Sequence, residues 1–99
     1  MLDELGPEVK THILREFVAR SSADLLTLAL VPSDHIGADL KFLAHRVRGT
    51  SLLIGAPELA QACHRVETAS TSDAEAITAL RDALVAAVGA VEREIHAHP

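Results

Sequence analysis

The architecture follows from one stretch of the chain, residues 33–59, which read SDHIGADLKFLAHRVRGTSLLIGAPEL. Apolar residues recur in it every three or four positions, the spacing of one helix face. Ser33 is a suitable N-cap, and Gly55 is the residue type that commonly ends a helix, so we predict a helix over residues 34–54. Pro57 suits the first position of a following helix. Because a very short turn joins the two helices, we expect them to pack antiparallel.

The sequence before this pair predicts two more helices. Gly6-Pro7 marks the start of the first one, because proline at the first helical position gives up no hydrogen bond. Ser21-Ser22 followed by Asp24 indicates a break and a new N-cap. We therefore expect a short apolar helix over residues 25–30, which ends before Pro32 because the residue before a proline is pushed out of helical geometry.

The sequence after the pair predicts the last helix. The fourth helix is expected to end at Thr71-Ser72, and Ser72 and Glu75 have the spacing of a capping box that starts the fifth. That helix is expected to run to about His96, with apolar residues at helical spacing. The predicted fold is all-α, an antiparallel four-helix bundle with an additional N-terminal helix, in one domain over residues 1–99.

Composition excludes several classes of function. The 99 residues carry a net charge of −5 and only two aromatic side chains, whereas nucleic-acid binding needs a basic footprint and stacking platforms. No apolar run approaches the ~20 residues of a membrane span, and the acidic N-terminus does not resemble a signal peptide. The single cysteine, Cys63, allows no internal disulfide. From these features we expect a cytoplasmic protein that binds neither nucleic acid nor a membrane.

The predicted helix over residues 34–54 presents one histidine to solvent. At about 100° per residue, His45 lies opposite the apolar face of the helix. Gly49 follows one turn later, although glycine inside a helix costs about 1 kcal/mol relative to alanine. Its missing side chain leaves the imidazole open to close approach by another molecule. The apolar face is expected to comprise Ile36, Leu40, Leu43, Val47 and Ile54.

The surroundings of this histidine are basic and partly apolar. The chain as a whole is acidic, but the stretch around this histidine contains basic residues and no acidic ones. An anion near the imidazole would therefore be stabilised. Exposed apolar residues clustered around one polar group suggest a docking surface. Each feature alone is common on a solvated helix, but their coincidence around one imidazole indicates a functional site. The basic side chains are Lys41, Arg46 and Arg48, and the apolar ones are Phe42 and Leu52.

One stretch also carries a family resemblance. Residues 44–67 read AHRVRGTSLLIGAPELAQACHRVE, and without gaps this resembles the pattern A-H-x-L-K-G-S-S-x-x-[LIF]-G-A-x-x-L-x-x-x-C-x-x-L-E of the histidine-containing phosphotransfer (HPt) family of two-component phosphorelays. Val47, Arg48 and Thr50 replace the usual leucine, lysine and serine. Arginine keeps the charge of the usual lysine but changes the donor geometry.

The resemblance implies a phosphorelay intermediate. His45 would accept a phosphoryl group from a phospho-aspartate of one receiver domain and pass it to an aspartate of another. The implied partners are the receiver domains of response regulators and of a hybrid histidine kinase, and the chain is expected to be a monomer. No cofactor is expected on this chain, because the Mg²⁺ of the family's reaction belongs to the receiver.

The resemblance also implies roles for the neighbours of His45. Gly49 would give clearance, and Arg48, with Lys41 nearby, would stabilise charge on the phosphate. Basic charge would complement the acidic site of the receiver and assist association. The implied docking residues are Ala38, Lys41, Phe42, Arg46 and Leu52.

Glu67 is expected beside His45. His45 lies ten residues before Gly55 and Glu67 twelve after it, so antiparallel helices bring the two to about the same height. In relatives this position, often Glu or Gln, can reach the imidazole. We predict that His45 Nδ1–H donates to the Glu67 carboxylate, which would fix the tautomer and leave Nε2 free as the nucleophile. The other interpretation is a plain surface acid, with Gln61 and His64 as weaker substitutes.

Other interpretations stay open at this point. The chain could be a degenerate four-helix interaction module that docks without phosphotransfer, or an excised HPt domain of a hybrid sensor kinase. A metal site is not expected, since Cys63 falls on an apolar stripe and is predicted to be a buried thiol. His96 and His98 supply two ligands, whereas zinc needs four, or three and water.

Overall fold

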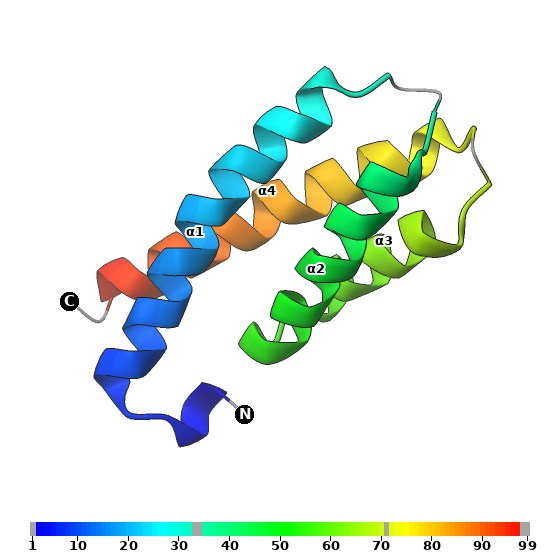
Figure 1. The fold of residues 1–99 in the computed structure, drawn as a ribbon. Coiled ribbons are helices and arrows are strands. Elements are labelled where there is room, and N and C mark those ends of the chain that lie inside the picture. Colours follow the sequence, from blue (N-terminus) through cyan, green and yellow to red (C-terminus); the bar gives the residue numbers. More distant parts are fainter. Residues whose placement is uncertain (1, 33–34, 71, 98–99) are drawn as a thin grey trace.

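The computed structural model describes residues 2–32, 35–70 and 72–97. Within these ranges a 3-10 turn, Leu2–Glu4, precedes four helices and no strand occurs. The all-α prediction is therefore confirmed, but the additional N-terminal helix is not found in the described part of the chain. The helices are α1 (Pro7–Leu30), α2 (Ala38–Ile54), α3 (Pro57–Thr68) and α4 (Ala74–Ala97) (Figure 1).

A separate short helix over residues 25–30 was expected because of a break at Ser21-Ser22, and this prediction is wrong. α1 runs through the pair without interruption, and the Ser22 hydroxyl donates to the Val18 carbonyl at 3.3 Å within the helix. Asp24 does not cap a new helix, because its buried carboxylate accepts a hydrogen bond from Arg46 of α2. After its first residue α1 contains neither glycine nor proline, so its backbone has no reason to break.

α2 differs from its prediction at the start and agrees with it at the end. It begins at Ala38 rather than at residue 34, and the predicted cap Ser33 lies outside the described residues. At its end, Gly55 has a φ of 75°, the left-handed conformation that favours glycine. The Ala56 amide then donates to the Ser51 carbonyl at 2.9 Å, which closes the helix. The tight turn sets α3 antiparallel to α2, as predicted (Figure 1).

The boundary between α3 and α4 also differs from its prediction. α3 ends at Thr68, earlier than expected, and α4 begins after Asp73 instead of after a Ser72–Glu75 capping box. The Asp73 carboxylate accepts a hydrogen bond from the Ala76 amide at 3.0 Å, so aspartate is the cap. Glu75 is engaged in an ion pair with α3 instead.

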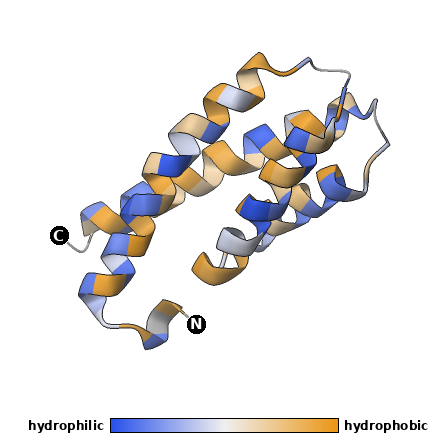
Figure 2. Ribbon diagram, in the orientation of Figure 1, coloured by the Kyte–Doolittle hydropathy of each residue, from blue (hydrophilic) through white to orange (hydrophobic). Residues whose placement is uncertain are grey.

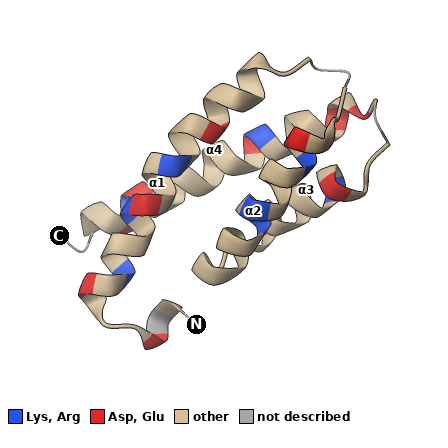
Figure 3. Cartoon of the chain, viewed as in Figure 1, with Lys and Arg blue, Asp and Glu red and all other residues tan. Residues whose placement is uncertain are grey.

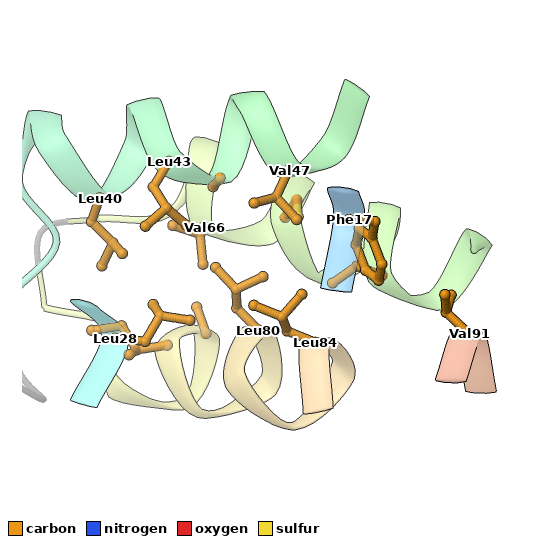
Figure 4. Close-up of a cluster of buried hydrophobic side chains, with 14 of the residues drawn as sticks. Phe17, Leu28, Leu40, Leu43, Val47, Val66, Leu80, Leu84 and Val91 are labelled. Atoms are coloured by element: carbon orange, nitrogen blue, oxygen red, sulfur yellow. The ribbon is translucent and has the colours of Figure 1, made fainter. Parts of the chain in front are cut away.

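The core lies where the apolar faces of the helices meet. α2 packs most extensively on α3, and α4 packs on both α1 and α3, whereas α1 and α2 contact each other at few points. The predicted apolar face of α2 is confirmed at its central residues, and Ile54 is only partly buried. Figure 4 shows the side chains that meet, among them Phe17 and Leu28 of α1, Leu40, Leu43 and Val47 of α2, Val66 of α3, and Leu80 and Leu84 of α4.

Hydrophobic residues are not confined to the core. They dominate the last turns of α1 (Figure 2), where Leu26 and Leu30 remain exposed. In the described ranges, no helix is both long and apolar enough to span a membrane.

Candidate functional site

His45 projects from the middle of α2 into solvent. Its side chain is 74% exposed, as predicted from the helical angle. Gly49 lies one turn further along, and a Cβ atom placed on it would meet no described heavy atom within 4 Å apart from its chain neighbours and the backbone of its own helix. The imidazole therefore stands on an open surface to which another molecule has access.

Glu67 lies beside this imidazole, in the last turn of α3. His45 Nδ1 and Glu67 Oε1 are 2.7 Å apart, a short hydrogen bond. The structure thus contains the interaction that the register of the two helices predicted. Because a carboxylate only accepts, Nδ1 is assigned as the donor, and Nε2 of the neutral ring carries the free lone pair.

The second carboxylate oxygen of Glu67 holds Arg48. Arg48 Nη1 donates to Glu67 Oε2 at 2.9 Å, and the Glu67 side chain is only 16% exposed. Burial raises the pKa of Glu67, but the hydrogen bonds from Arg48 and His45 outweigh burial, and the net effect lowers this pKa below its ordinary value. Glu67 is therefore ionised at neutral pH and links the side chains of His45 and Arg48.

The other two basic residues of α2 have partners elsewhere. Lys41 Nζ donates to the Ala69 carbonyl at 3.1 Å, just beyond the end of α3. Arg46 turns toward α1 and donates to the Asp24 carboxylate, whose side chain is 8% exposed. The expected basic cluster around the imidazole is thus reduced to Arg48, with Lys41 one turn away and Arg46 on another side of the helix.

Three of the predicted docking residues, Phe42, Leu52 and Ala38, are uncharged and form an exposed apolar rim. Phe42 is 70% exposed and Leu52 54% exposed, on either side of His45 along α2, and Ala38 is exposed at the start of the helix. Three basic residues and a single acidic one, Asp39, lie on α2 (Figure 3). The face around His45 therefore combines apolar surface with positive charge.

Two partners of these basic side chains were not foreseen from the sequence. The Ala69 carbonyl is a backbone group, so no pattern of residue types predicts that Lys41 binds it. Asp24 carried a signal, since it is the single charged residue between positions 21 and 32 and sits among leucines. A charged residue in so apolar a helix segment is a candidate for a buried ion pair.

The remaining nucleophile and ligand candidates lie apart from this site or carry no cluster. Cys63 is fully buried, as predicted, and burial raises its pKa to about 12, so the thiol stays protonated. His64 and His96 are exposed, and His98 lies outside the described residues. Within the described ranges, no three His, Cys, Asp or Glu side chains are grouped so that they could hold a metal ion.

Comparison with known proteins assigns the family. A model of the Hpt domain matches residues 12–96, which is most of the chain. The chain belongs to the Hpt domain family. No curated protein and no solved structure matches it significantly. Hpt domains are helical bundles that take part in histidine phosphotransfer in two-component phosphorelays, where they interact with receiver domains.

Proposed function

We propose that His45 is the phosphorylated residue of this Hpt domain, which relays a phosphoryl group between two receiver domains. The donor is a phospho-aspartate on one receiver, such as that of a hybrid histidine kinase, and the acceptor is an aspartate on a response regulator. The observation that carries the proposal is the open imidazole of His45, whose Nδ1 is engaged by Glu67 at 2.7 Å and whose Nε2 has no partner among the described residues.

The chemistry is a pair of displacements at phosphorus. The Nε2 lone pair attacks the phosphorus of the aspartyl phosphate, an N–P bond forms, and the bond from phosphorus to the aspartate oxygen breaks to release the carboxylate. The Nδ1 proton stays on the ring, where the Glu67 carboxylate stabilises the positive charge that develops. Transfer to the second receiver reverses these steps, with its aspartate carboxylate as nucleophile.

Arg48 supports the phosphoryl group in this proposal. A guanidinium has five N–H donors, and the contact with Glu67 uses one of them at 2.9 Å. The side chain is 39% exposed beside the imidazole, so its other donors can face phosphate oxygens. Phosphoryl transfer depends mainly on positioning and on stabilisation of charge, and Arg48 and Glu67 supply both.

The receiver docks, in this proposal, on the apolar rim of Phe42, Leu52 and Ala38. Positive charge on α2 complements the acidic site of the receiver, which contributes the Mg²⁺. Gly49 provides the clearance that lets the aspartate approach Nε2.

Transfer of label tests the proposal directly. The protein is incubated with receiver domains carrying a radiolabelled phosphoryl group, and the label on this chain is examined for the acid-labile, base-stable behaviour of phosphohistidine. Wild type should be labelled and His45→Gln should not, while His64→Gln, an exposed histidine on α3, serves as the matched control. Label that persists on His45→Gln would refute the assignment. A wild type that binds receivers and is never labelled would favour the non-phosphorylated interaction module.

A further inference from the structure

Three side chains of α2, spaced at i, i+4 and i+7, hold the end of α3. His45 and Arg48 each bind one oxygen of the Glu67 carboxylate, at 2.7 and 2.9 Å. Lys41 binds the Ala69 carbonyl, two residues further along, at 3.1 Å. The first two contacts restrain the side chain of Glu67, and the third restrains the backbone that carries it.

The end of α3 needs such a restraint. α3 has only 12 residues, and Glu67 is the last but one of them. The last carbonyls of a helix lack intrahelical partners, and helix ends fray. Ala69 is extended and does not adopt the left-handed conformation that usually closes a helix, and its amide reaches Val66 only at 3.4 Å. A catalytic carboxylate on a fraying turn would be poorly placed.

Lys41 suits this task by charge and by position. A cation stabilises the negative end of a helix dipole and satisfies its free carbonyls. Lys41 is partly buried, and within the described ranges its ammonium has no carboxylate partner. Its position one turn before His45 on the same side of α2 means that one rigid helix sets both the imidazole and the backbone of its hydrogen-bond partner.

We propose that Lys41 is a positioning residue of the transfer site. By holding the Ala69 carbonyl, it keeps the last turn of α3 in place and the Glu67 carboxylate within reach of His45 Nδ1. This inference rests on the proposed function for its importance to transfer. The positioning itself exists before any phosphoryl group arrives, which separates it from direct binding of phosphate by the Lys41 ammonium.

The unphosphorylated protein provides the decisive measurement. Nitrogen-15 NMR of the imidazole reports which ring nitrogen of His45 carries the proton. Wild type and Lys41→Arg, which keeps a charged donor, should show the Nδ1–H form. Lys41→Met keeps most of the stem and removes the donor, so His45 should shift toward a mixture of the two tautomers. Arg81→Met, which removes an exposed cation of α4, should leave the tautomer unchanged.

Transfer kinetics complete the test. Lys41→Met should slow phosphoryl transfer roughly tenfold, and it should add little further loss in a Glu67→Ala background, where there is no carboxylate to position. If Lys41→Met lowers the melting temperature so far that spectra cannot be recorded, Lys41→Gln, which is neutral but shorter, takes its place.

Two results would overturn the inference. One is an unchanged Nδ1–H tautomer in folded Lys41→Met, and slower transfer in that variant would then assign Lys41 to the phosphate itself. The other is full additivity of Lys41→Met and Glu67→Ala. A wild type that never accepts a phosphoryl group would refute the proposed function, yet the tautomer comparison would still decide whether Lys41 positions Glu67.

Discussion

α2 is held very differently on its two sides. Toward α3 it packs closely, and three of its side chains bind either Glu67 in the last turn of that helix or the Ala69 carbonyl just beyond it, within 3.1 Å. Toward α1 it makes few contacts, and a groove of about 470 Å³ separates the two helices beside the Arg46–Asp24 ion pair. Polar contacts thus hold the His45 imidazole where the helices already pack tightly, and they replace packing where the helices stand apart.

The largest effect on transfer is expected at Gly49, which lies one turn after His45 on α2. Gly49→Leu should slow transfer about a hundredfold, because a side chain there obstructs the approach to Nε2. It should also stabilise the fold by about 0.8 kcal/mol, since leucine favours helix and the space around position 49 is open. Transfer kinetics and urea unfolding measure the two effects.

Gly89→Ala, a glycine within α4, is the matched control and should leave transfer unaltered. A Gly49→Leu protein that unfolds more easily and transfers at the normal rate would show that Gly49 serves packing.

The largest effect on stability is expected on the α1 side. Arg46→Met leaves the Asp24 carboxylate, 8% exposed, without its cation, and should lower the free energy of unfolding by about 2 kcal/mol. The groove lets water reach the Asp24 carboxylate, so the loss in free energy of unfolding should be smaller than for a fully enclosed ion pair. Transfer by the folded protein should not change.

The double variant Arg46→Met, Asp24→Leu should recover most of the stability, because it removes the orphaned charge. Slower transfer in folded Arg46→Met would instead return Arg46 to the docking surface.

A smaller effect is expected at Arg48. Arg48→Ala should slow transfer about tenfold through loss of charge near the phosphate. Its side chain is 39% exposed, and exposed ion pairs contribute little, so stability should change by less than about 1 kcal/mol. Kinetics and thermal melting of the same sample compare the two effects. An equal loss in both would make the Arg48–Glu67 contact a structural ion pair.

The smallest effect is the pH dependence that Glu67 imparts. Its pKa is lower in the folded chain than in the unfolded one, so its contribution to stability is fully present above the unfolded pKa of about 4.3. That contribution is lost as the pH falls through the folded pKa. Unfolding free energies between neutral pH and about pH 3 should therefore decline less in Glu67→Gln than in wild type, with Glu58→Gln on α3 as the control. Parallel declines in wild type and Glu67→Gln would contradict this linkage.

Sequence reasoning succeeded where the determinants are local. Gly55 and Pro57 define the hairpin of α2 and α3, and the count of residues across it places Glu67 beside His45. It failed at Asp24, because aspartate suits both the N-cap of a helix and a buried ion pair. Arg46 decides between these, and it lies 22 positions away in sequence. The contact of Lys41 escaped for a related reason, since its acceptor is a backbone carbonyl.

Because of the hairpin turn at Gly55, the number of residues on either side of the turn decides whether Glu67 lies beside His45. One residue inserted between Gly55 and Glu67 would rotate the end of α3 by about 100° and carry the carboxylate off the imidazole, with every side chain still chemically intact. The connection between α1 and α2 does not affect this register, because α1 contributes no group to the contacts between His45, Arg48 and Glu67. A change in the length of the first loop would therefore leave His45 and Glu67 in register, whereas a change in the spacing from His45 to Glu67 would separate them.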